Sequence, residues 1–175
     1  RSGVTGEKLA PPLNESWVFK AVRPPEPAWP PPAKQDFYHR HHDLRETVAY
    51  DRAFHVVGAG ETIFFGSSAD DKVYALDART GRPRWRFFTE GPVRFAPCVA
   101  DGKVYVGSDD GWAYCLSAQD GTLLWKYKAT EQDRLIPGNQ RMISMWPLRT
   151  GLLVDEGAVY FGAGLFPNQG TFLFA

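Results

Sequence analysis

The sequence predicts an all-β protein made of β-propeller blades, because a unit of about 40 residues occurs twice in it. Residues 73–85 and 113–125 align at a spacing of 40 residues. Such a unit buries its apolar faces only against neighbouring copies. The 14 prolines and 14% aromatic residues in 175 also fit a loop-rich β protein better than a helical one. The pairs in register are Tyr74/Tyr114, Leu76/Leu116, Gly81/Gly121 and Trp85/Trp125.

Each unit divides into four short strands joined by tight turns, which predicts a four-stranded antiparallel meander. Asp101-Gly102 is a strong signal for a type I′ hairpin turn, in which both central residues have positive φ. In the first unit, residues 62–66 are β-branched and aromatic and end on glycine. Residues 53–58 supply the innermost strand of that unit. The strands expected in the second unit are 95–100, 103–108, 111–117 and 122–128.

A third copy begins at residues 155–162 and continues through 170–175, where Phe174 stands at the position of Tyr74 and Tyr114. The sequence therefore supplies two full blades and part of a third. A closed propeller usually has about four to eight blades. We expect that the chain is a fragment of a longer polypeptide, or else that several copies close the ring together.

The chain divides into a proline-rich N-terminal extension, residues 1–42, and propeller repeats over residues 43–175. The prolines favour an extended polyproline II course, which predicts a linker or a surface strap. Trp17, Phe19 and Trp29 of this strap are expected to pack on the outer face of a blade and to cover its edge.

The connection between the second and third units is about fourteen residues longer than the repeat requires, and the extra residues lie within 129–149. In a propeller, this insert shares one face of the disc with the loop that follows the second strand of each blade. Insertions in repeat proteins often map to the binding face. The residues of the candidate binding face are Asp70, Asp109, Asp110, Arg134, Asn139, Gln140 and Arg141.

Two interpretations of this face remain open. Arg134 and Arg141, close to the three aspartates, would form an anion-binding or carboxylate-bridged site with Asn139 and Gln140 as neutral partners. Alternatively, the arginines pair with the aspartates to hold the blades together, and apolar residues of the insert fill the seam. Those apolar residues are Met142, Ile143, Met145 and Trp146.

The best candidate for a metal site is the histidine cluster near residue 40, where His39, His41 and Asp43 can share one side of an extended segment. Arg40 and Arg45 beside them oppose a cation. We therefore expect a polar surface segment and no metal.

Cys98 is expected on the first strand of its blade and Cys115 on the third, facing opposite sides of the sheet. Strands that are two apart lie about 9–10 Å from each other, which is beyond disulfide reach. We therefore expect both cysteines to be free, buried thiols.

The pattern Ala75-x-Asp77-x-x-Thr80-Gly81-x-x-x-Trp85 resembles the tryptophan-docking repeat of the pyrroloquinoline quinone (PQQ) dehydrogenases and of the wider PQQ-like β-propellers, which include non-catalytic outer-membrane assembly proteins. The resemblance covers roughly residues 50–175. The second copy departs from it at Cys115, Ser117 and Asp120. The resemblance implies that four residues dock neighbouring blades. They are Gly81, Trp85, Gly121 and Trp125.

The resemblance leaves two functions open. The first is a non-catalytic scaffold or binding module, part of a larger extracytoplasmic, for example periplasmic, protein with protein partners and the remaining blades around it. The second is part of a PQQ- and calcium-dependent oxidoreductase that acts on an alcohol or sugar. We favour the first, with no cofactor in this chain, because the sequence has no recognisable acid and base pair. It also has no adjacent cysteines, which the resemblance to quinoprotein alcohol dehydrogenases would place over the quinone.

The charge balance excludes one class of partner. The chain has 20 basic and 20 acidic residues and no net charge, so it lacks the electrostatic footprint of a nucleic-acid-binding protein. The longest apolar stretches have the length of strands, so no transmembrane helix is expected, and no signal peptide is recognised.

Overall fold

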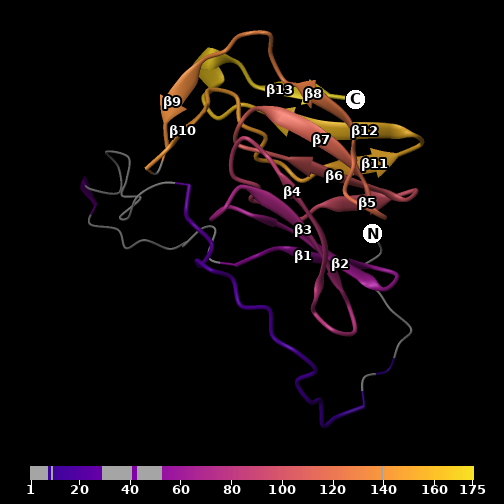
Figure 1. The fold of residues 1–175 in the computed structure, drawn as a ribbon. Coiled ribbons are helices and arrows are strands. Elements are labelled where there is room, and N and C mark those ends of the chain that lie inside the picture. The colour runs from indigo at the N-terminus through magenta and orange to yellow at the C-terminus, as the bar shows by residue number, and fades with distance from the viewer. Residues whose placement is uncertain (1–7, 9, 29–40, 43–52, 139) are drawn as a thin grey trace.

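The computed structural model describes residues 8, 10–28, 41–42, 53–138 and 140–175. Three antiparallel sheets stack on one another in chain order, and the N-terminal segment runs along the outside of the first sheet (Figure 1). In the part of the chain described, no helix is long and apolar enough to cross a membrane.

The first sheet has the order β1-β2-β3-β4 and the second the order β5-β6-β7-β8, as the repeat predicts, and the third has the order β11-β12-β13. The first sheet contains β1 (Val56–Ala59), β2 (Thr62–Ser67), β3 (Lys72–Asp77) and β4 (Pro83–Phe88). The second contains β5 (Cys98–Ala100), β6 (Lys103–Gly107), β7 (Trp112–Ser117) and β8 (Leu123–Lys128). The third contains β11 (Leu153–Asp155), β12 (Ala158–Ala163) and β13 (Phe172–Phe174), with the short 3-10 helix η1 (Pro167–Gln169) before β13.

The expected turn chemistry is confirmed between β5 and β6. Asp101 has φ 48° and Gly102 has φ 70°, which is the pair of positive values that a type I′ turn needs. The strand before this turn begins at Cys98 rather than at residue 95. Pro97 precedes it and has no N–H to contribute to the ladder.

Apolar residues pack in the seams between the sheets. The seam between the first and second sheets contains Phe64, Val73, Ala75, Trp85, Val93, Val104, Val106, Tyr114 and Leu116. The seam between the second and third sheets contains Cys98, Tyr105, Ala113, Cys115, Ala129, Leu148, Leu152, Phe161 and Ala163.

Trp85 of β4 closes the first of these seams. Its side chain is 9% exposed, and its indole Nε1 donates a hydrogen bond to the carbonyl oxygen of Ala118 at 3.1 Å. The ring lies flat on Gly121, where a Cβ atom would be only 2.6 Å from the indole. Gly121 has φ 75°. The turn therefore needs glycine for its backbone conformation and for the close approach of the ring.

Trp125 occupies the repeat position on β8 but is 37% exposed. Its ring packs at 5.9 Å from that of Tyr105, and no glycine in the described residues contacts it. The docking role expected for Trp125 therefore stays a prediction.

The N-terminal segment repeats the Trp85 arrangement on the first sheet. Trp17 Nε1 donates to the carbonyl oxygen of Ala78 at 3.0 Å, and a Cβ atom at Gly81 would lie 2.5 Å from the Trp17 ring. Phe19 meets Tyr74 edge to face at 5.5 Å. The seam behind them contains Phe65, Tyr74 and Leu76.

The first and second sheets share an equivalent edge-to-face contact, in which the ring centroids of Phe87 and Tyr114 lie 5.7 Å apart. Trp17 and Phe19 therefore contact the first sheet as Trp85 and Phe87 contact the second. The segment around Trp17 occupies the place of the outermost strand of a preceding blade.

The two cysteines are free and buried, as expected, but their side chains do not face opposite sides. Cys98 and Cys115 both pair with Tyr105, so they lie in one row across the sheet and share a face. The register differs by one residue from the expected one because Ser108 pairs with Trp112, so the turn contains three residues, Asp109, Asp110 and Gly111, and not two. A shift of one residue turns a side chain to the other face.

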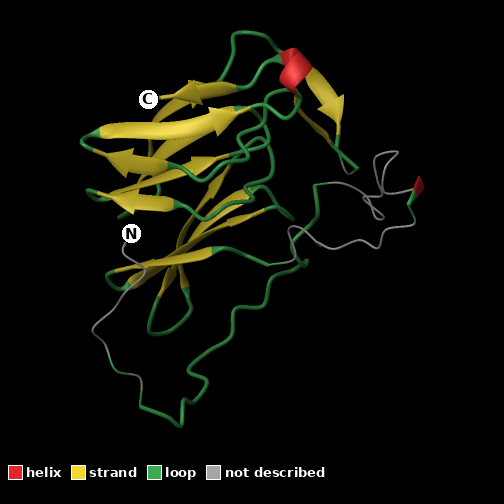
Figure 2. Cartoon of the chain, turned by 180° about the vertical axis from the view of Figure 1, so that it is seen from behind, coloured by secondary structure: helices red, strands yellow, loops and turns green. Residues whose placement is uncertain are grey.

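The insert folds into a hairpin of β9 (Leu135–Pro137) and β10 (Met142–Ser144). Seen from behind, it projects from the upper edge of the stacked sheets (Figure 2). Ser144 N donates to the carbonyl oxygen of Asp109 at 2.8 Å, and Leu148 N donates to that of Ser108 at 3.0 Å. The insert is thus fastened to the loop between β6 and β7.

The contact between Trp85 and Gly121 can be tested by its effect on stability, with Gly102 as a matched control position. Gly102→Ala and Gly121→Ala both place alanine at positive φ, but a Cβ at Gly102 meets nothing within 4 Å. We expect Gly121→Ala to lower the free energy of unfolding by about 1–3 kcal/mol more than Gly102→Ala in urea titrations, because the alanine collides with the Trp85 ring. Gly81→Ala should match Gly121→Ala, because Trp17 lies on Gly81. Equal losses at Gly102 and Gly121 would contradict the docking role.

Candidate functional site

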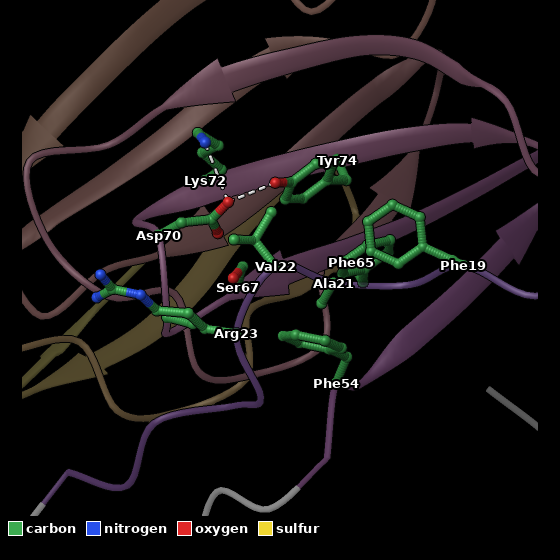
Figure 3. A pocket seen from close by; sticks show the side chains of 11 residues that line it. Phe19, Ala21, Val22, Arg23, Phe54, Phe65, Ser67, Asp70, Lys72 and Tyr74 are labelled. Carbon is green, nitrogen blue, oxygen red and sulfur yellow. Dashed lines mark hydrogen bonds and ion pairs between the residues drawn. The ribbon is translucent and has the colours of Figure 1, made fainter.

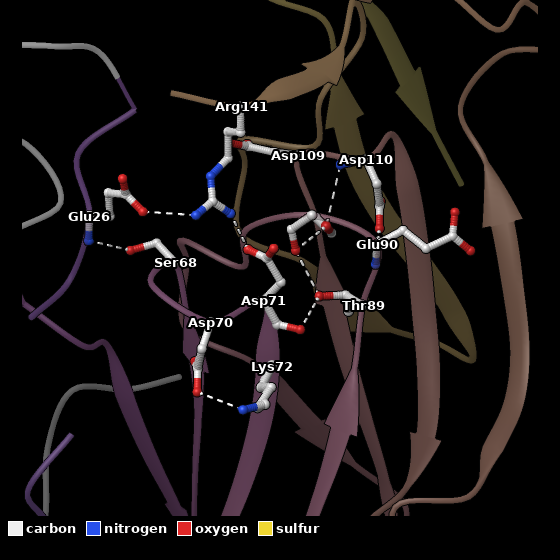
Figure 4. Close-up of polar contacts among 12 residues, drawn as sticks. Glu26, Ser68, Asp70, Asp71, Lys72, Thr89, Glu90, Asp109, Asp110 and Arg141 are labelled. Carbon is white, nitrogen blue, oxygen red and sulfur yellow. Dashed lines mark hydrogen bonds and ion pairs between the residues drawn. The ribbon is translucent and has the colours of Figure 1, made fainter. Parts of the chain in front are cut away.

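The loops after β2 and β6 and the inserted hairpin lie at one end of the sheets, where hydrogen bonds and ion pairs connect their polar side chains (Figure 4). Asp109 lies deepest, with 1% of its side chain exposed. Arg94 Nε donates to Asp109 Oδ2 at 2.7 Å. Arg149 donates from Nε to Oδ1 at 2.8 Å and from Nη2 to Oδ2 at 2.9 Å. The carboxylate of Asp109 therefore joins two guanidinium groups in the interior.

The arginine partners of Asp109 correct the sequence-based interpretation, which paired the aspartates with Arg134 and Arg141. Arg94 and Arg149 were missed, although a signal for them exists. The second sheet is preceded by Pro92-Val93-Arg94 and the third by Pro147-Leu148-Arg149. Each tripeptide stands at the same distance along the sequence before an equivalent glycine, which is Gly107 at the end of β6 or Gly162 in β12. Each arginine belongs to a linker between blades, and both reach the same carboxylate.

Asp110 connects the end of the first sheet to the second. Its Oδ2 accepts hydrogen bonds from Glu90 N at 3.0 Å and from the Tyr114 hydroxyl at 2.7 Å, and its Oδ1 accepts from Trp112 N at 2.9 Å. Burial raises the pKa of the Asp110 carboxyl. Burial and the neighbouring carboxylate raise the pKa of Tyr114. Both oxygens of Asp110 are thus used inside the protein.

Asp70 and Tyr74 repeat this pair in the first sheet. The Tyr74 hydroxyl and the Lys72 ammonium group both donate to Asp70 Oδ2, the latter at 3.0 Å. Burial and the bond to Asp70 raise the pKa of Tyr74 to about 12. Asp70 Oδ1 is buried and has no hydrogen-bond partner, which distinguishes Asp70 from Asp110.

Arg141 of the insert reaches back across the second sheet. It forms ion pairs with Asp71 and with Glu26 of the N-terminal segment, the latter at 2.8 Å. Burial raises the pKa of Asp71, and Arg141 opposes that shift. Glu26 is held by its backbone as well, because its N–H donates to Ser68 Oγ at 2.9 Å and its carbonyl accepts from Arg94 Nη1 at 2.6 Å.

The other polar residues predicted for this face lie apart from the aspartates. Arg134 is exposed and donates from Nη1 to Gln169 Oε1 at 3.3 Å. Gln140 is exposed at the hairpin tip with φ 58°. Asn139 lies outside the described residues.

The apolar residues of the insert divide between two sides. Ile143, Met145 and Trp146 are buried, and Trp146 Nε1 donates to the carbonyl oxygen of Gln169 at 2.8 Å. Met142 is 55% exposed, so it does not fill the seam.

The histidine cluster lies mostly beyond what the structure describes. His41 and His42 meet edge to face at 5.0 Å, whereas His39 and Asp43 fall outside the described residues. In the described ranges, no three side chains of histidine, cysteine, aspartate or glutamate converge on a possible metal position. Asp109 and Asp110, the most buried carboxylates, are already engaged by arginines and by hydrogen-bond donors. The described residues therefore do not fit the calcium ion that a bound PQQ would need.

A cavity of about 240 Å³ lies between the N-terminal segment and the first sheet (Figure 3). Aromatic rings form one end of it, and charged and polar side chains gather at the other. Its lining residues are Phe19, Ala21, Val22, Arg23, Phe54, Phe65, Ser67, Ala69, Asp70, Lys72 and Tyr74.

Known proteins resemble this chain in sequence and in fold. It is 31% identical over 70 residues to the outer membrane protein assembly factor BamB of Moranella endobia strain PCIT, which is 40% of this chain and 18% of that protein. The match to BamB of Yersinia pestis has the same extent and identity. The chain thus spans less than a fifth of the length of these curated relatives.

Among solved structures, quinohemoprotein alcohol dehydrogenase from Comamonas testosteroni matches with a TM-score of 0.52 and 23% identity, over 63% of this chain and 17% of that one. This likeness shows a shared propeller fold. A family model described as outer membrane protein assembly factor BamB matches residues 33–163, which is most of the chain. The chain therefore belongs to this family of PQQ-like β-propeller repeats.

Proposed function

We propose that the chain is part of a non-catalytic propeller that serves as a scaffold and binds protein partners at its insert. One observation carries this proposal. The charged groups of the loop face are used to fasten blades, insert and N-terminal segment to one another, whereas the inserted hairpin presents apolar side chains outward. The side chain of Asp109 is 1% exposed and both of its carboxylate oxygens bind arginines, so neither oxygen is available to a substrate.

The outward side of the hairpin is defined by its register. Met142 pairs with Pro137 and Ile143 with Ile136, so alternate residues face opposite sides. Ile143 faces inward and is 2% exposed, while Leu135 is 60% and Met142 55% exposed. Exposed apolar side chains that gather on one surface often mark protein interaction sites. The hairpin patch, Leu135, Pro137 and Met142, is the proposed contact.

The family supports this role and an extracytoplasmic location. The matched relatives are named as factors for the assembly of outer membrane proteins. We place residues 1–42 as a strap and 43–175 as blades of a larger propeller, whose remaining blades come from the same polypeptide or from other copies. Trp125 would then dock on a turn of the next blade.

A second candidate is part of a PQQ- and calcium-dependent oxidoreductase. It is favoured by the fold shared with quinohemoprotein alcohol dehydrogenases, at 23% identity in the Comamonas testosteroni enzyme and 24% in the Pseudomonas putida HK5 enzyme. A bound quinone would supply the electron-accepting chemistry. The described residues offer no free set of carboxylates for its calcium ion.

The buried ion cluster predicts a large stability effect. Asp109→Ala removes the carboxylate between Arg94 and Arg149, of which 3% and 12% of the side chains are exposed. We expect a loss of about 3–5 kcal/mol in the free energy of unfolding, because two buried guanidinium groups lose the carboxylate that lies between them. The control is Asp133→Ala, where the side chain is 87% exposed and a change within about 0.5 kcal/mol is expected. Similar urea midpoints for the two variants would contradict a fastening role.

Partner binding at the hairpin can be tested by photo-crosslinking in the native host. A photoreactive amino acid at Met142 should give discrete crosslinked species, whereas one at Val56, which is 62% exposed on β1, should not. Leu135→Asp should reduce the Met142 crosslinks by at least about tenfold, the loss expected when an interface anchor is removed. Crosslinks that are equally strong from both positions, or that survive Leu135→Asp, would argue against this contact.

The oxidoreductase alternative is tested by tryptophan fluorescence during titration with PQQ, with calcium and with a chelator in its place. We expect no saturable quenching under either condition. Saturable quenching that requires both PQQ and calcium would support the enzyme and count against the scaffold.

A further inference from the structure

We propose that residues 20–25 of the N-terminal segment form a flap over the first sheet, and that the ion pair between Glu26 and Arg141 controls how often this flap opens. The inserted hairpin, which carries Arg141, then regulates access to the cavity beneath the flap. This inference concerns a motion of the chain itself, so it holds whether or not the hairpin patch binds a partner.

Apolar packing fixes the N-terminal end of the flap. The indole of Trp17 lies flat on Gly81, and the Phe19 ring meets Tyr74 edge to face at 5.5 Å. Both rings pack against the apolar cluster of the first sheet. Such contacts depend on buried apolar area and respond little to the charges of the loop face. This end is therefore the fixed end of the flap.

Polar contacts at Glu26 hold the other end. Its backbone N–H donates to Ser68 Oγ at 2.9 Å, and its carbonyl oxygen accepts from Arg94 Nη1 at 2.6 Å. Its carboxylate accepts from Arg141 Nη2 at 2.8 Å, as Figure 4 shows. The side chains of Glu26 and Arg141 are 26% and 23% exposed, so water and salt reach this ion pair. The polar end is therefore the one that can be released.

The residues between the two ends make few contacts of their own. Val22 is 98% exposed. The other exposed residues of the flap are Lys20, Ala21, Arg23 and Pro24. In the described part of the chain, no hydrogen bond joins residues 20–25 to the first sheet. A segment with exposed backbone and little buried apolar surface opens locally at low cost in free energy.

A cavity of about 240 Å³ lies between the flap and the sheet (Figure 3). Ala21 lines it from the flap, and Phe65, Ala69 and Tyr74 line it from the sheet. Because this space is unfilled, opening the flap breaks fewer van der Waals contacts than opening a packed seam. An open flap uncovers the aromatic wall of the cavity and Ala69, which is 7% exposed in the closed structure.

Arg141 transmits the position of the inserted hairpin to the flap. It stands beside the hairpin turn, where Gly138 N donates to its carbonyl oxygen at 2.7 Å. Its guanidinium group also pairs with Asp71, whose carbonyl oxygen accepts from Thr89 N at 2.9 Å and from Thr89 Oγ1 at 3.0 Å. Asp71 and Arg141 therefore remain paired when Glu26 leaves. A displacement of the hairpin, by contrast, withdraws Arg141 from Glu26 and releases the flap.

The flap can be tested with a cysteine placed beneath it. In the full chain carrying Ala69→Cys, alkylation of residue 69 by iodoacetamide reports opening of the flap. The native Cys98 and Cys115, buried between the second and third sheets, report unfolding of the whole protein. Peptide mapping by mass spectrometry separates the three sites. We expect Glu26→Gln to speed alkylation at residue 69 by at least about tenfold, because a charged hydrogen-bonded pair is lost, and to leave Cys98 and Cys115 unchanged.

The partner residue and two controls locate the effect. Arg141→Gln should speed alkylation at residue 69 as Glu26→Gln does, and the double variant should add less than about twofold, since both changes remove one contact. The matched controls Glu15→Gln and Arg134→Gln change exposed residues of the same two segments and should leave the rate at residue 69 unaltered.

Salt provides a second measurement. Raising sodium chloride from about 0.05 to about 1 M should speed alkylation at residue 69, and this effect should disappear once Glu26→Gln is present. Equal rates with and without Glu26→Gln would overturn the proposal. Rates that rise together at all three cysteines would overturn it as well, because residues 20–25 would then not open separately. If Ala69→Cys does not fold, tryptic cleavage after Lys20 replaces alkylation as the readout, with the same expected and contrary results.

Discussion

The structure depends on one interaction, the packing of an indole ring on a glycine turn of the neighbouring sheet. A large ring buries much apolar surface there, and its N–H must find an acceptor once it is buried. Trp85 meets both conditions through Gly121 and the carbonyl oxygen of Ala118. Trp17 makes the same contact with Gly81 and the carbonyl oxygen of Ala78, so the N-terminal segment and the first sheet are placed in the same way as the first and second sheets.

The buried carboxylate of Asp109 is the second constraint, because it joins two linkers between neighbouring sheets. Two guanidinium groups surround it, each from a different linker between sheets. Burying these charges is costly unless every group is paired, and here all of them converge on one carboxylate. Arg94 also binds the carbonyl oxygen of Glu26, so the N-terminal segment belongs to the same network. A loop face occupied in this way holds the sheets, the insert and the N-terminal segment together.

Small departures from the repeat create the features that distinguish this chain. Trp17 and Phe19 take the positions of Trp85 and Phe87, but the backbone that follows them does not reach Asp70 as Glu90 reaches Asp110. The aromatic contacts are set by apolar packing, which tolerates such a substitution. The hydrogen bond depends on the position of a single N–H group. Asp70 also lacks the bond that Trp112 N makes to Asp110 Oδ1 inside the second sheet, so Asp70 Oδ1 stays without a partner.

The sequence by itself determined the blades, because strand alternation, Asp-Gly turns and a spacing of 40 residues are local signals that neighbouring copies repeat. It also singled out Trp85 and Gly121, which contact each other between the first and second sheets, and the long connection before the third blade. Only the tertiary structure decided the partners of Asp109, since Arg94 and Arg149 lie on separate linkers and meet through the stacking of three sheets. The shared face of Cys98 and Cys115 and the bridge from Arg141 to Glu26 were likewise decided there. A one-residue change in a loop reverses a strand's faces, and ion pairs between distant segments depend on the path of the whole chain.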